Sequence, residues 1–383
     1  MNILVVCHYG LYEDLSYSFV HNQIREYAAL GHRVRVIIPN GLGKTGRGGG
    51  RLEKPLLISQ ADGVELYDFR YLTLSRYGQR GFNTASAIAA LALQWNQFFS
   101  DFRPDVIHAH TLGFDSEIGA WLKRKFNCPL VITTHGSDTN MPLEIGQHNY
   151  LKVWCDQADT VVAVSKKLAN RLKICGTTTP IAAILNGFVP RKTQKNSARD
   201  PFSIIQVGNL VRSKRVDLTI RAFSMLRKKW PDMKLTIIGQ GPLHSELEEL
   251  CKQLEVSDAV RFLGQLPNGE VIQKMEESGF FVMASKPEGF GIVYLEAMSA
   301  GCVTVGTEGQ GISDIIDHGM NGFLVPSDDP TRIAELLDWC LRNPEDSDRI
   351  AQEGKKLASE MTWEKNAGEY IKLFNKLKEK SIN

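Results

Sequence analysis

The 383-residue sequence lacks the cysteine spacing of a disulfide-rich or zinc-binding protein. Its seven cysteines are odd in number, scattered along the chain, and nowhere arranged as Cys-x-x-Cys. Such a pattern is typical of reduced thiols in a cytosolic protein. We therefore expect a cytoplasmic protein without a disulfide framework or a zinc site.

The sequence also lacks long apolar runs and a strong charge of either sign. No run of about 18 apolar residues occurs, so no segment is expected to span a bilayer. Residues 1–7 are apolar but have no basic leader, which favours a buried strand over a signal peptide. The formal net charge of +2 argues against a dedicated nucleic-acid-binding protein. Residues 123–125, Lys-Arg-Lys, are either a solvated helix face or a peripheral contact with the inner face of a membrane.

What the sequence does contain is an alternation of strand-like and helix-like segments in both halves. Strands that alternate with helices predict parallel α/β sheets. The strand-like segments are residues 3–7, 33–38, 64–69, 105–108, 130–134, 160–164, 203–207, 234–239, 260–262 and 280–284. The clearest helix-like segments are residues 20–30, 86–99, 216–229 and 243–254.

A polar stretch at residues 190–201 separates the two alternations and is the best linker candidate. The predicted fold class is therefore α/β, with two Rossmann-like domains at residues 1–189 and 202–363 that face each other across a cleft. Ligands bind such sheets at the carboxyl ends of their strands. A charged helix at about 364–383 is able to pack back on the first domain.

The most informative motif begins at Pro287 and reads Pro-Glu-Gly-Phe-Gly-Ile-Val-Tyr-Leu-Glu. Its glycines let backbone N–H groups approach a phosphate, and a helix that begins near Phe290 would direct its positive end there. Glu288 and Glu296 can accept hydrogen bonds from sugar hydroxyls at two separate points. This combination favours a sugar-nucleotide site over a solvated turn.

Three further candidates follow strands in the second half. Lys214 could meet the phosphates of a nucleotide, or could be a solvated loop lysine. The segment at 239–242, Gly-Gln-Gly-Pro, permits close approach of the backbone to a ligand but fits a simple tight turn equally well. Leu266, which follows the next strand, could border a nucleotide base.

From residue 207 to about residue 330 the chain closely resembles the glycosyltransferases of family 4, which are retaining enzymes of the GT-B fold. The resemblance rests on the order and spacing of four elements. They are a Gly-x-Leu-x-x-x-Lys stretch, the Gly-x-Gly-Pro turn, a Glu-x7-Glu element, and Asn-Gly-Phe-Leu-Val-Pro-x-x-Asp beginning at Asn321. Residues 1–189 resemble the family more loosely, and the sequence is weakly similar to bacterial teichuronic-acid and capsule-type enzymes.

The resemblance implies a hexosyltransferase that needs no cofactor or metal and uses a nucleoside-diphosphate sugar, by default a UDP-sugar. The implied acceptor is a glycan, a lipid-linked molecule or a small molecule, in the context of polysaccharide synthesis. In such enzymes the carboxylate at Glu288 contacts the donor sugar and that at Glu296 the ribose, while Lys214 and nearby backbone amides hold the diphosphate. The residues implied to be catalytic are Glu288, His135 and Lys214. Those implied to bind the donor are Gly10, Asn209, Arg212, Lys214, Gly241, Leu266, Glu288, Gly289, Phe290, Gly291, Ile292 and Glu296.

Two positions depart from the family pattern. Asn209 stands where the family usually has arginine, so part of the phosphate-binding charge is missing unless Arg212 or Arg215 supplies it. Residues 309–311, Gly-Gln-Gly, stand where many relatives begin a Gly-Gly-x-x-Glu pattern.

Other interpretations of the same residues stay open. His135 is either close to the transferred sugar, as the resemblance implies, or a satisfied loop histidine. A metal site at His108, His110 and His135 is disfavoured because no carboxylate or cysteine completes a ligand set. A sugar-nucleotide epimerase of similar architecture, and an inactive glycan-binding scaffold, are the two alternative functions.

Overall fold

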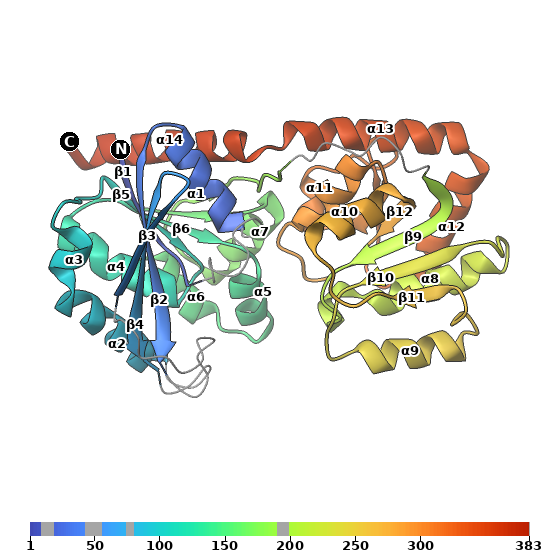
Figure 1. Cartoon of the computed structure of the whole chain (residues 1–383), viewed down its shortest axis with the longest axis horizontal. Helices are drawn as coiled ribbons and strands as arrows, with labels where there is room; N and C mark the ends of the chain where they lie inside the picture. The colour runs from blue at the N-terminus through green and yellow to red at the C-terminus, as the bar shows by residue number, and fades with distance from the viewer. Residues whose placement is uncertain (9–18, 43–55, 74–79, 190–198, 383) are drawn as a thin grey trace. The chain divides into compact units, whose positions relative to one another are not determined.

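The computed structural model describes residues 1–8, 19–42, 56–73, 80–189 and 199–382. The chain divides into two compact units, one made of Met1–Leu185 with Trp363–Asn383 and the other of Asn186–Thr362 (Figure 1). Each unit is built around one β-sheet in which nearly all neighbouring strands run parallel.

The sheet of the first unit has the strand order β3-β4-β2-β1-β5-β6-β7-β8. Every neighbouring pair is parallel except β3 and β4, which are antiparallel. The strands are β1 (Asn2–Val6), β2 (Arg33–Leu42), β3 (Leu56–Ala61), β4 (Val64–Leu72), β5 (Val106–His110), β6 (Leu130–Thr134), β7 (Thr160–Ala163) and β8 (Ile181–Ala183). Because β1, β5 and β6 are parallel neighbours, His8 and the residues that follow β5 and β6 lie at one edge of the sheet.

Helices cover both faces of this sheet, as alternate side chains of β1 show. Leu4 and Val6 enter one apolar core, while Ile3 and Val5 enter the core on the opposite face. The helices are α1 (Phe19–Ala29), α2 (Arg80–Leu93), α3 (Trp95–Phe99), α4 (Phe114–Phe126), α5 (Ser137–Glu144), α6 (His148–Cys155), α7 (Lys166–Leu172) and α14 (Trp363–Ile382), with a 3-10 turn η1 (Lys173–Cys175).

The last helix of the chain, α14, belongs to the first unit and lies beside α1 (Figure 1). Gln23 on α1 donates from Nε2 to Oδ1 of Asn366 at 2.6 Å. Tyr370 shares a hydrogen bond of 2.8 Å with Thr133 at the end of β6. The C-terminal residues are thus held by buried polar contacts as well as by apolar packing.

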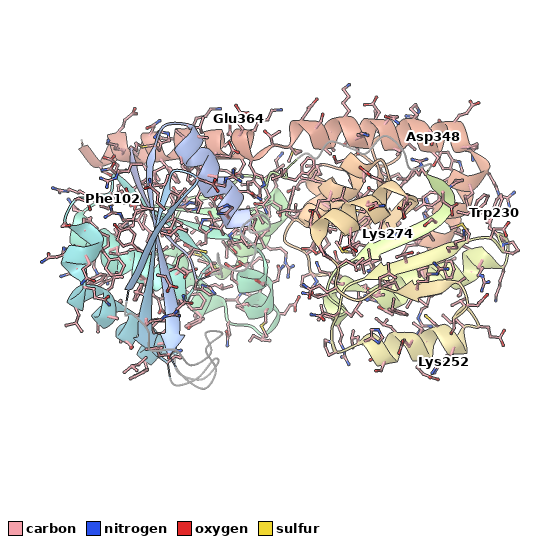
Figure 2. All side chains as sticks on the ribbon, in the orientation of Figure 1. Phe102, Trp230, Lys252, Lys274, Asp348 and Glu364 are labelled. Atoms are coloured by element: carbon pink, nitrogen blue, oxygen red, sulfur yellow. The ribbon has the colours of Figure 1, made fainter. Side chains whose placement is uncertain are left out.

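The second unit contains a parallel sheet with the order β11-β10-β9-β12-β13-β14. Its strands are β9 (Asp200–Val207), β10 (Lys234–Ile238), β11 (Val260–Phe262), β12 (Ser278–Val282), β13 (Val303–Thr307) and β14 (Phe323–Val325). Its helices are α8 (Val216–Arg227), α9 (His244–Gln253), α10 (Asn268–Glu276), α11 (Ile292–Ala300), α12 (Pro330–Arg342) and α13 (Pro344–Glu360), with 3-10 turns η2 (Arg212–Lys214) and η3 (Gly311–Asp314). At its surface Trp230 donates from Nε1 to Asp338 at 2.9 Å (Figure 2).

The predicted α/β class with parallel sheets is confirmed, and several predicted boundaries differ from the structure. The helix expected at 86–99 is two helices that meet at Gln94, and β3, β8, β13 and β14 are strands that the sequence analysis did not indicate. Of the predicted linker, residues 190–198 lie outside the described residues. Asp200 and Pro201 belong to β9, because the N–H of Asp200 donates to the carbonyl oxygen of Glu277 at 3.0 Å.

None of the helices in the described parts of the chain combines the length and the apolar character that crossing a membrane requires.

Candidate functional site

The carboxyl edge of the second sheet brings together glycine-rich loops from β9 and β10. A Cβ on Gly239, whose φ is +140°, would lie 1.9 Å from the carbonyl oxygen of Gly208, and one on Gly241 would lie 2.4 Å from that of Leu210. The N–H of Leu210 also donates to the carbonyl oxygen of Gln240 at 3.0 Å. Both glycines after β10 are therefore required for contact between two backbones. Whether Gly241 also contacts a ligand stays a prediction.

Lys214 and Glu288 form the central ion pair of this edge. Lys214 Nζ lies 2.5 Å from Oε2 of Glu288, and the two side chains are 24% and 13% exposed. Gln206 donates to the carbonyl oxygen of Lys214 at 2.8 Å, and the N–H of Lys286 donates to the carbonyl oxygen of Ser213 at 2.7 Å. The turn η2 and the segment after β12 are thereby fixed to each other, and the pair is accessible to a ligand.

Residues at the start of η3 hold the turn from Glu288 to Gly291 in place. The N–H of Glu288 donates to Oε1 of Gln310 at 2.8 Å, and its carbonyl oxygen accepts from the N–H of Gly311 at 3.3 Å. A Cβ on Gly311 would lie 1.9 Å from the carbonyl oxygen of Gly289. This packing fixes the backbone whose N–H groups precede α11.

Phe290, Gly291 and Tyr294 shape the start of α11. Phe290 is 2% exposed, so only its backbone is available to a ligand. Gly291 has φ +81°, and a Cβ there would lie 2.7 Å from the ring of Tyr294. The Tyr294 hydroxyl donates to the carbonyl oxygen of Met283 at 2.7 Å and contacts Ser285 at 3.0 Å. Burial raises the pKa of Tyr294, so this anchor stays protonated.

The helix begins at Ile292 and not near Phe290 as expected. Gly291 lies in the left-handed region and therefore cannot be part of the right-handed helix. Glu296 consequently lies just over one turn into α11. Its Oε1 accepts a hydrogen bond from Nδ2 of Asn268 at 3.0 Å, which orients the carboxylate.

The two arginines considered as substitutes for the missing charge at Asn209 differ in their partners. Arg215 is paired with Asp328 and lies 3.5 Å from Asp217. Arg212 is exposed and has no carboxylate partner among the residues that the structure describes. Asn209 is exposed as well. Of these two arginines, Arg212 is therefore the one whose charge is not neutralised by a carboxylate.

In the first unit, a histidine and a buried aspartate meet at the ends of β1 and β5. Nδ1 of His8 lies 2.8 Å from Oδ2 of Asp115, which is fully buried at the start of α4, whereas the His8 side chain is 40% exposed. Thr111 also donates to Asp115 at 3.1 Å. The Asp115 charge is the largest influence on the pKa of His8 and raises it, although burial opposes the effect.

Three further histidines lie in the first unit, His108 and His110 on β5 and His135 directly after β6. Nδ1 of His110 lies 3.1 Å from Nε2 of His135, and Nε2 of His108 lies 2.8 Å from the hydroxyl of Thr133. Burial lowers the pKa of His135 to about 3, and burial together with His135 lowers that of His108 to about 3. At neutral pH His135 is therefore an uncharged hydrogen-bonding group and not a cation.

Asp138 fixes the backbone around His135. Its Oδ1 accepts from the N–H groups of His135 and Gly136, both at 3.0 Å, and its Oδ2 accepts from the N–H of Leu112 at 2.9 Å. Among the described residues, no group of three histidine, cysteine or carboxylate side chains is placed to hold a metal ion.

Two family models match this chain. Residues 18–192 match the family described as Glycosyltransferase Family 4, and residues 190–357 match that described as Glycosyl transferases group 1. An uncharacterised glycosyltransferase of Methanocaldococcus jannaschii is 30% identical over 298 residues, which are 70% of this chain and 75% of that relative. The chain belongs to glycosyltransferase family 4.

A second relative and a solved structure extend this result. The glycosyltransferase is 28% identical over 256 residues to N-acetyl-alpha-D-glucosaminyl L-malate synthase of Bacillus anthracis, which is 63% of this chain and 66% of that relative. HepE of Anabaena, solved in complex with UDP and glucose, has a TM-score of 0.74 at 19% identity, with 98% of this chain and 100% of that chain covered. The likeness to HepE shows the fold, which is GT-B.

The structure of the glycosyltransferase brings most of the predicted donor residues to one edge of the second unit. Gly208 lies under the side chain of Lys214, since a Cβ there would be 3.7 Å from three of the lysine carbons. Leu266 is half-buried after β11, and the adjacent Gln265 accepts from Gln240 at 2.7 Å. Gly10 lies outside the described residues. His135 belongs to the first unit.

Sequence reasoning missed the residues that support this glycosyltransferase site. Asn268 orients Glu296, and Tyr294 packs against Gly291 from within the Glu-x7-Glu motif, where nothing marks it as a support. Asp115 pairs with His8 in the first unit. Asp115 could have been found, because it is a charged residue five positions after the strand that contains His108 and His110. Asn268 and Tyr294 gave no such signal.

Replacing Asp115 with asparagine is expected to lower the pKa of His8. The carboxylate that raises this pKa would be lost while the burial that lowers it remains. Because the pKa of His8 is raised in the folded state, its protonated form stabilises the fold below the ordinary pKa of 6.5, and this contribution is lost as the pH rises through the folded value. NMR titration of the histidine signals measures the shift.

His32 is the control in this titration, because its pKa is lowered by burial and by the chain N-terminus. Its pKa should be the same in both proteins. An unchanged pKa of His8 in the variant would show that Asp115 does not set it.

Proposed function

We propose that this glycosyltransferase transfers a hexose from a UDP-sugar to an acceptor hydroxyl with retention of configuration at the anomeric carbon. The observation that carries the proposal is the meeting of Lys214, Glu288 and the N-terminus of α11 at one edge of the second unit. HepE, a protein of the same fold, has been solved with UDP and glucose, which supports UDP as the carrier.

The diphosphate is proposed to lie between Lys214 and the start of α11. Departure of UDP develops negative charge, which an ammonium group, a helix N-terminus and fixed backbone N–H groups stabilise without reorganisation. Gly289, Gly291 and Ile292 would offer their N–H groups, as would Phe290. The rigid contacts of η3 and Tyr294 with this turn support a pre-organised site.

The two carboxylates are proposed to bind different parts of the donor. Glu288 is the first residue of the turn at residues 288–291, which is proposed to hold the diphosphate and is called the phosphate turn below. Its carboxylate therefore accepts hydrogen bonds from hydroxyls of the transferred hexose. Glu296, oriented by Asn268, accepts from the ribose hydroxyls. A role for His135 at the transferred sugar rests on the family resemblance, and its low pKa makes it an uncharged partner there.

In the proposed reaction the bond between the anomeric carbon and the phosphate oxygen breaks while the acceptor oxygen bonds on the same face. The acceptor proton passes to the departing diphosphate, so no strong protein base is needed. The acceptor is proposed to be a glycan, a lipid-linked molecule or a small molecule. The cysteine pattern supports a cytoplasmic setting, and we place the enzyme in polysaccharide synthesis.

Two experiments test this function. A thermal-shift screen over nucleoside diphosphates and UDP-hexoses should give the largest stabilisation with the donor, because binding stabilises by mass action. Transfer to a panel of hydroxyl acceptors, followed by NMR of the anomeric proton, gives the stereochemistry. An inverted product would refute retention. Conversion of the donor without an acceptor would indicate an epimerase, and binding without turnover an inactive scaffold.

Replacing Arg212 with alanine is expected to weaken UDP binding about tenfold, because a charge-assisted hydrogen bond contributes roughly 1.5 kcal/mol. Isothermal calorimetry at low and high salt measures this loss, which should shrink at high salt. If Arg212 supplies the charge missing at Asn209, then Asn209→Arg should restore affinity in the Arg212→Ala protein. Unchanged affinity in Arg212→Ala would remove Arg212 from the site.

A further inference from the structure

Gln310, the residue directly before η3, presents a buried side chain to the phosphate turn. The residue is 9% exposed, and its Oε1 accepts the N–H of Glu288 at 2.8 Å. A backbone N–H can only donate, so the amide oxygen must occupy this contact. The amide nitrogen, with two N–H donors, therefore faces away from the backbone of Glu288.

No hydrogen bond of the Gln310 amide nitrogen occurs within the described residues. This nitrogen is not one of the polar atoms that are fully buried without a partner. It therefore keeps some exposure to solvent and is accessible to a ligand. A largely buried donor without a partner is unfavourable, and a ligand oxygen would relieve that cost.

The backbone of Gln310 is fixed independently of its side chain. Its N–H donates to the carbonyl oxygen of Thr307 at 3.4 Å, and its carbonyl oxygen accepts from both the N–H and the hydroxyl of Ser313, at 3.0 Å and 2.6 Å. With both ends held, the amide is a rigid donor, which lowers the entropic cost of binding a ligand through it.

We propose that Gln310 determines which donor hexose is used, by donating from Nε2 to a sugar hydroxyl next to one held by Glu288. Glu288 offers acceptors and Gln310 offers donors, so the two together fit a vicinal pair of hydroxyls. One hydroxyl donates to the carboxylate and its neighbour accepts from the amide. This assignment rests on the proposed function, since it specifies the sugar bound at the same site.

The test is a cycle that combines Gln310→Ala with UDP-hexoses lacking one hydroxyl at a time. In the wild-type enzyme, removal of the hydroxyl that Gln310 contacts should lower kcat/KM about tenfold, the effect of one hydrogen bond. For each deoxy donor we take the ratio of kcat/KM with the intact UDP-hexose to kcat/KM with the deoxy donor. In Gln310→Ala this ratio should fall to about threefold or less for the donor that lacks the contacted hydroxyl. The ratios for the other deoxy donors should stay unchanged. A general disturbance of the turn would lower kcat/KM equally for all donors, so it would cancel from these ratios.

Two further variants separate the roles of the amide. Gln310→Met keeps much of the side-chain length but has no N–H donor, so it should lose the same discrimination as Gln310→Ala. Gln265→Ala removes another loop glutamine of this edge, one bonded to Gln240, and should leave every ratio unchanged. If all ratios in Gln310→Ala equal those of the wild type, the proposed contact is absent. If the wild-type enzyme transfers no hexose from any UDP-sugar, the proposed function itself fails and the inference with it.

Discussion

Lys214→Met is expected to lower kcat/KM for the UDP-hexose by about 100- to 1,000-fold, the range found when a fixed group that stabilises developing charge is removed. Methionine keeps the length and the apolar stem that lies over Gly208 but removes the ammonium group. The loss should fall mainly on kcat, because the charge on the diphosphate grows as the sugar departs. Steady-state kinetics with the donor identified by thermal shift measures it.

Lys286→Met is the matched control for this prediction. Lys286 lies two residues before Glu288, is 51% exposed, and donates to the hydroxyl of Ser327 at 2.8 Å instead of contacting Glu288. Its loss should change kcat/KM by no more than about threefold, since exposed pairs contribute little. Retention of more than a tenth of the activity by Lys214→Met, or an equal loss in Lys286→Met, would contradict the assigned role.

The Lys214–Glu288 pair also explains how a strongly charged site can be stable without a ligand. Each side chain is the counter-ion of the other, and both are partly exposed. Neither side chain is fully buried, so a donor that offers each of them a new partner can separate the pair. The diphosphate would then pair with the ammonium group, and the hexose hydroxyls would donate hydrogen bonds to the carboxylate. The pair in the structure is therefore compatible with both roles assigned to its members.

The sequence predicted which loops meet at this edge of the second sheet, because the candidate residues lie in continuous motifs. The Glu-x7-Glu element and the loop that contains Lys214 each follow a strand, and parallel strands bring such loops to one edge. The start of α11 was placed about two residues early, because the left-handed conformation of Gly291 cannot be read from its identity alone.

Contacts between distant residues could not be predicted in the same way. His8 and Asp115 are 107 residues apart, and Glu288 is bonded to Gln310 across 22 residues. In both cases one partner has no local signal that assigns it to the other. The strands β3, β8, β13 and β14 were missed. The pairing of β3 with β4 is antiparallel and departs from the alternation of strands and helices, whereas β8 and β14 are only three residues long.

Arg35→Met is expected to lower the free energy of unfolding of the first unit by about 3–5 kcal/mol, the usual cost of removing one partner from a buried ion pair. Arg35 on β2 is only 1% exposed. Its guanidinium group donates to the carbonyl oxygen of Phe98 at 2.5 Å and pairs with Glu65 and Asp101. Methionine would fill much of the space but leave that carbonyl oxygen and Glu65 without this donor.

Aromatic rings add to the environment of Arg35. Its guanidinium carbon lies 4.5 Å from the ring centres of both Tyr67 and Phe102. The arginines hold the pKa of Asp101 at about 2, through hydrogen bonds from Arg35 and then Arg33. Since this pKa is lowered, the stabilisation is present above the ordinary value of 3.8 and is lost as the pH falls through about 2. The difference between Arg35→Met and wild type should thus persist at pH 5.

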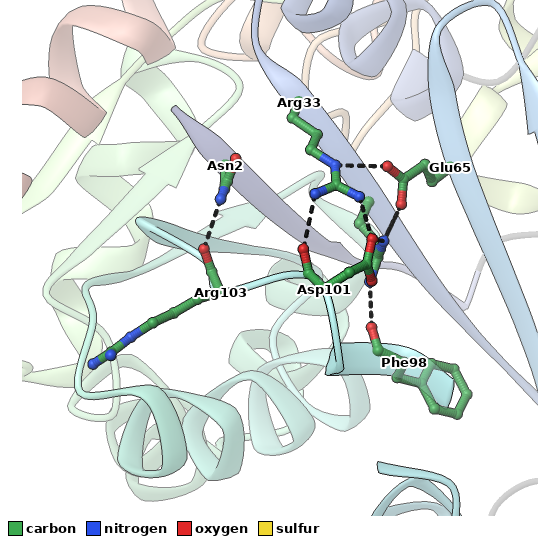
Figure 3. Close-up of polar contacts among 7 residues, drawn as sticks. Asn2, Arg33, Glu65, Phe98, Asp101 and Arg103 are labelled. Atoms are coloured by element: carbon green, nitrogen blue, oxygen red, sulfur yellow. Dashed lines mark hydrogen bonds and ion pairs between the residues drawn. The ribbon is translucent and has the colours of Figure 1, made fainter. Parts of the chain in front are cut away.

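Arg33→Met provides the control, because Arg33 contacts the same two carboxylates from the surface (Figure 3). Its side chain is 41% exposed, so its loss should cost about 1 kcal/mol or less. Hydrogen exchange of peptides from β2 and β4 reports the stability of this unit, and peptides from β9 and β10 serve as an internal reference. Two units need not unfold together, so a single global midpoint would not separate them. Equal effects of the two substitutions would show that burial of Arg35, and with it the cluster around Phe98, does not stabilise the first sheet.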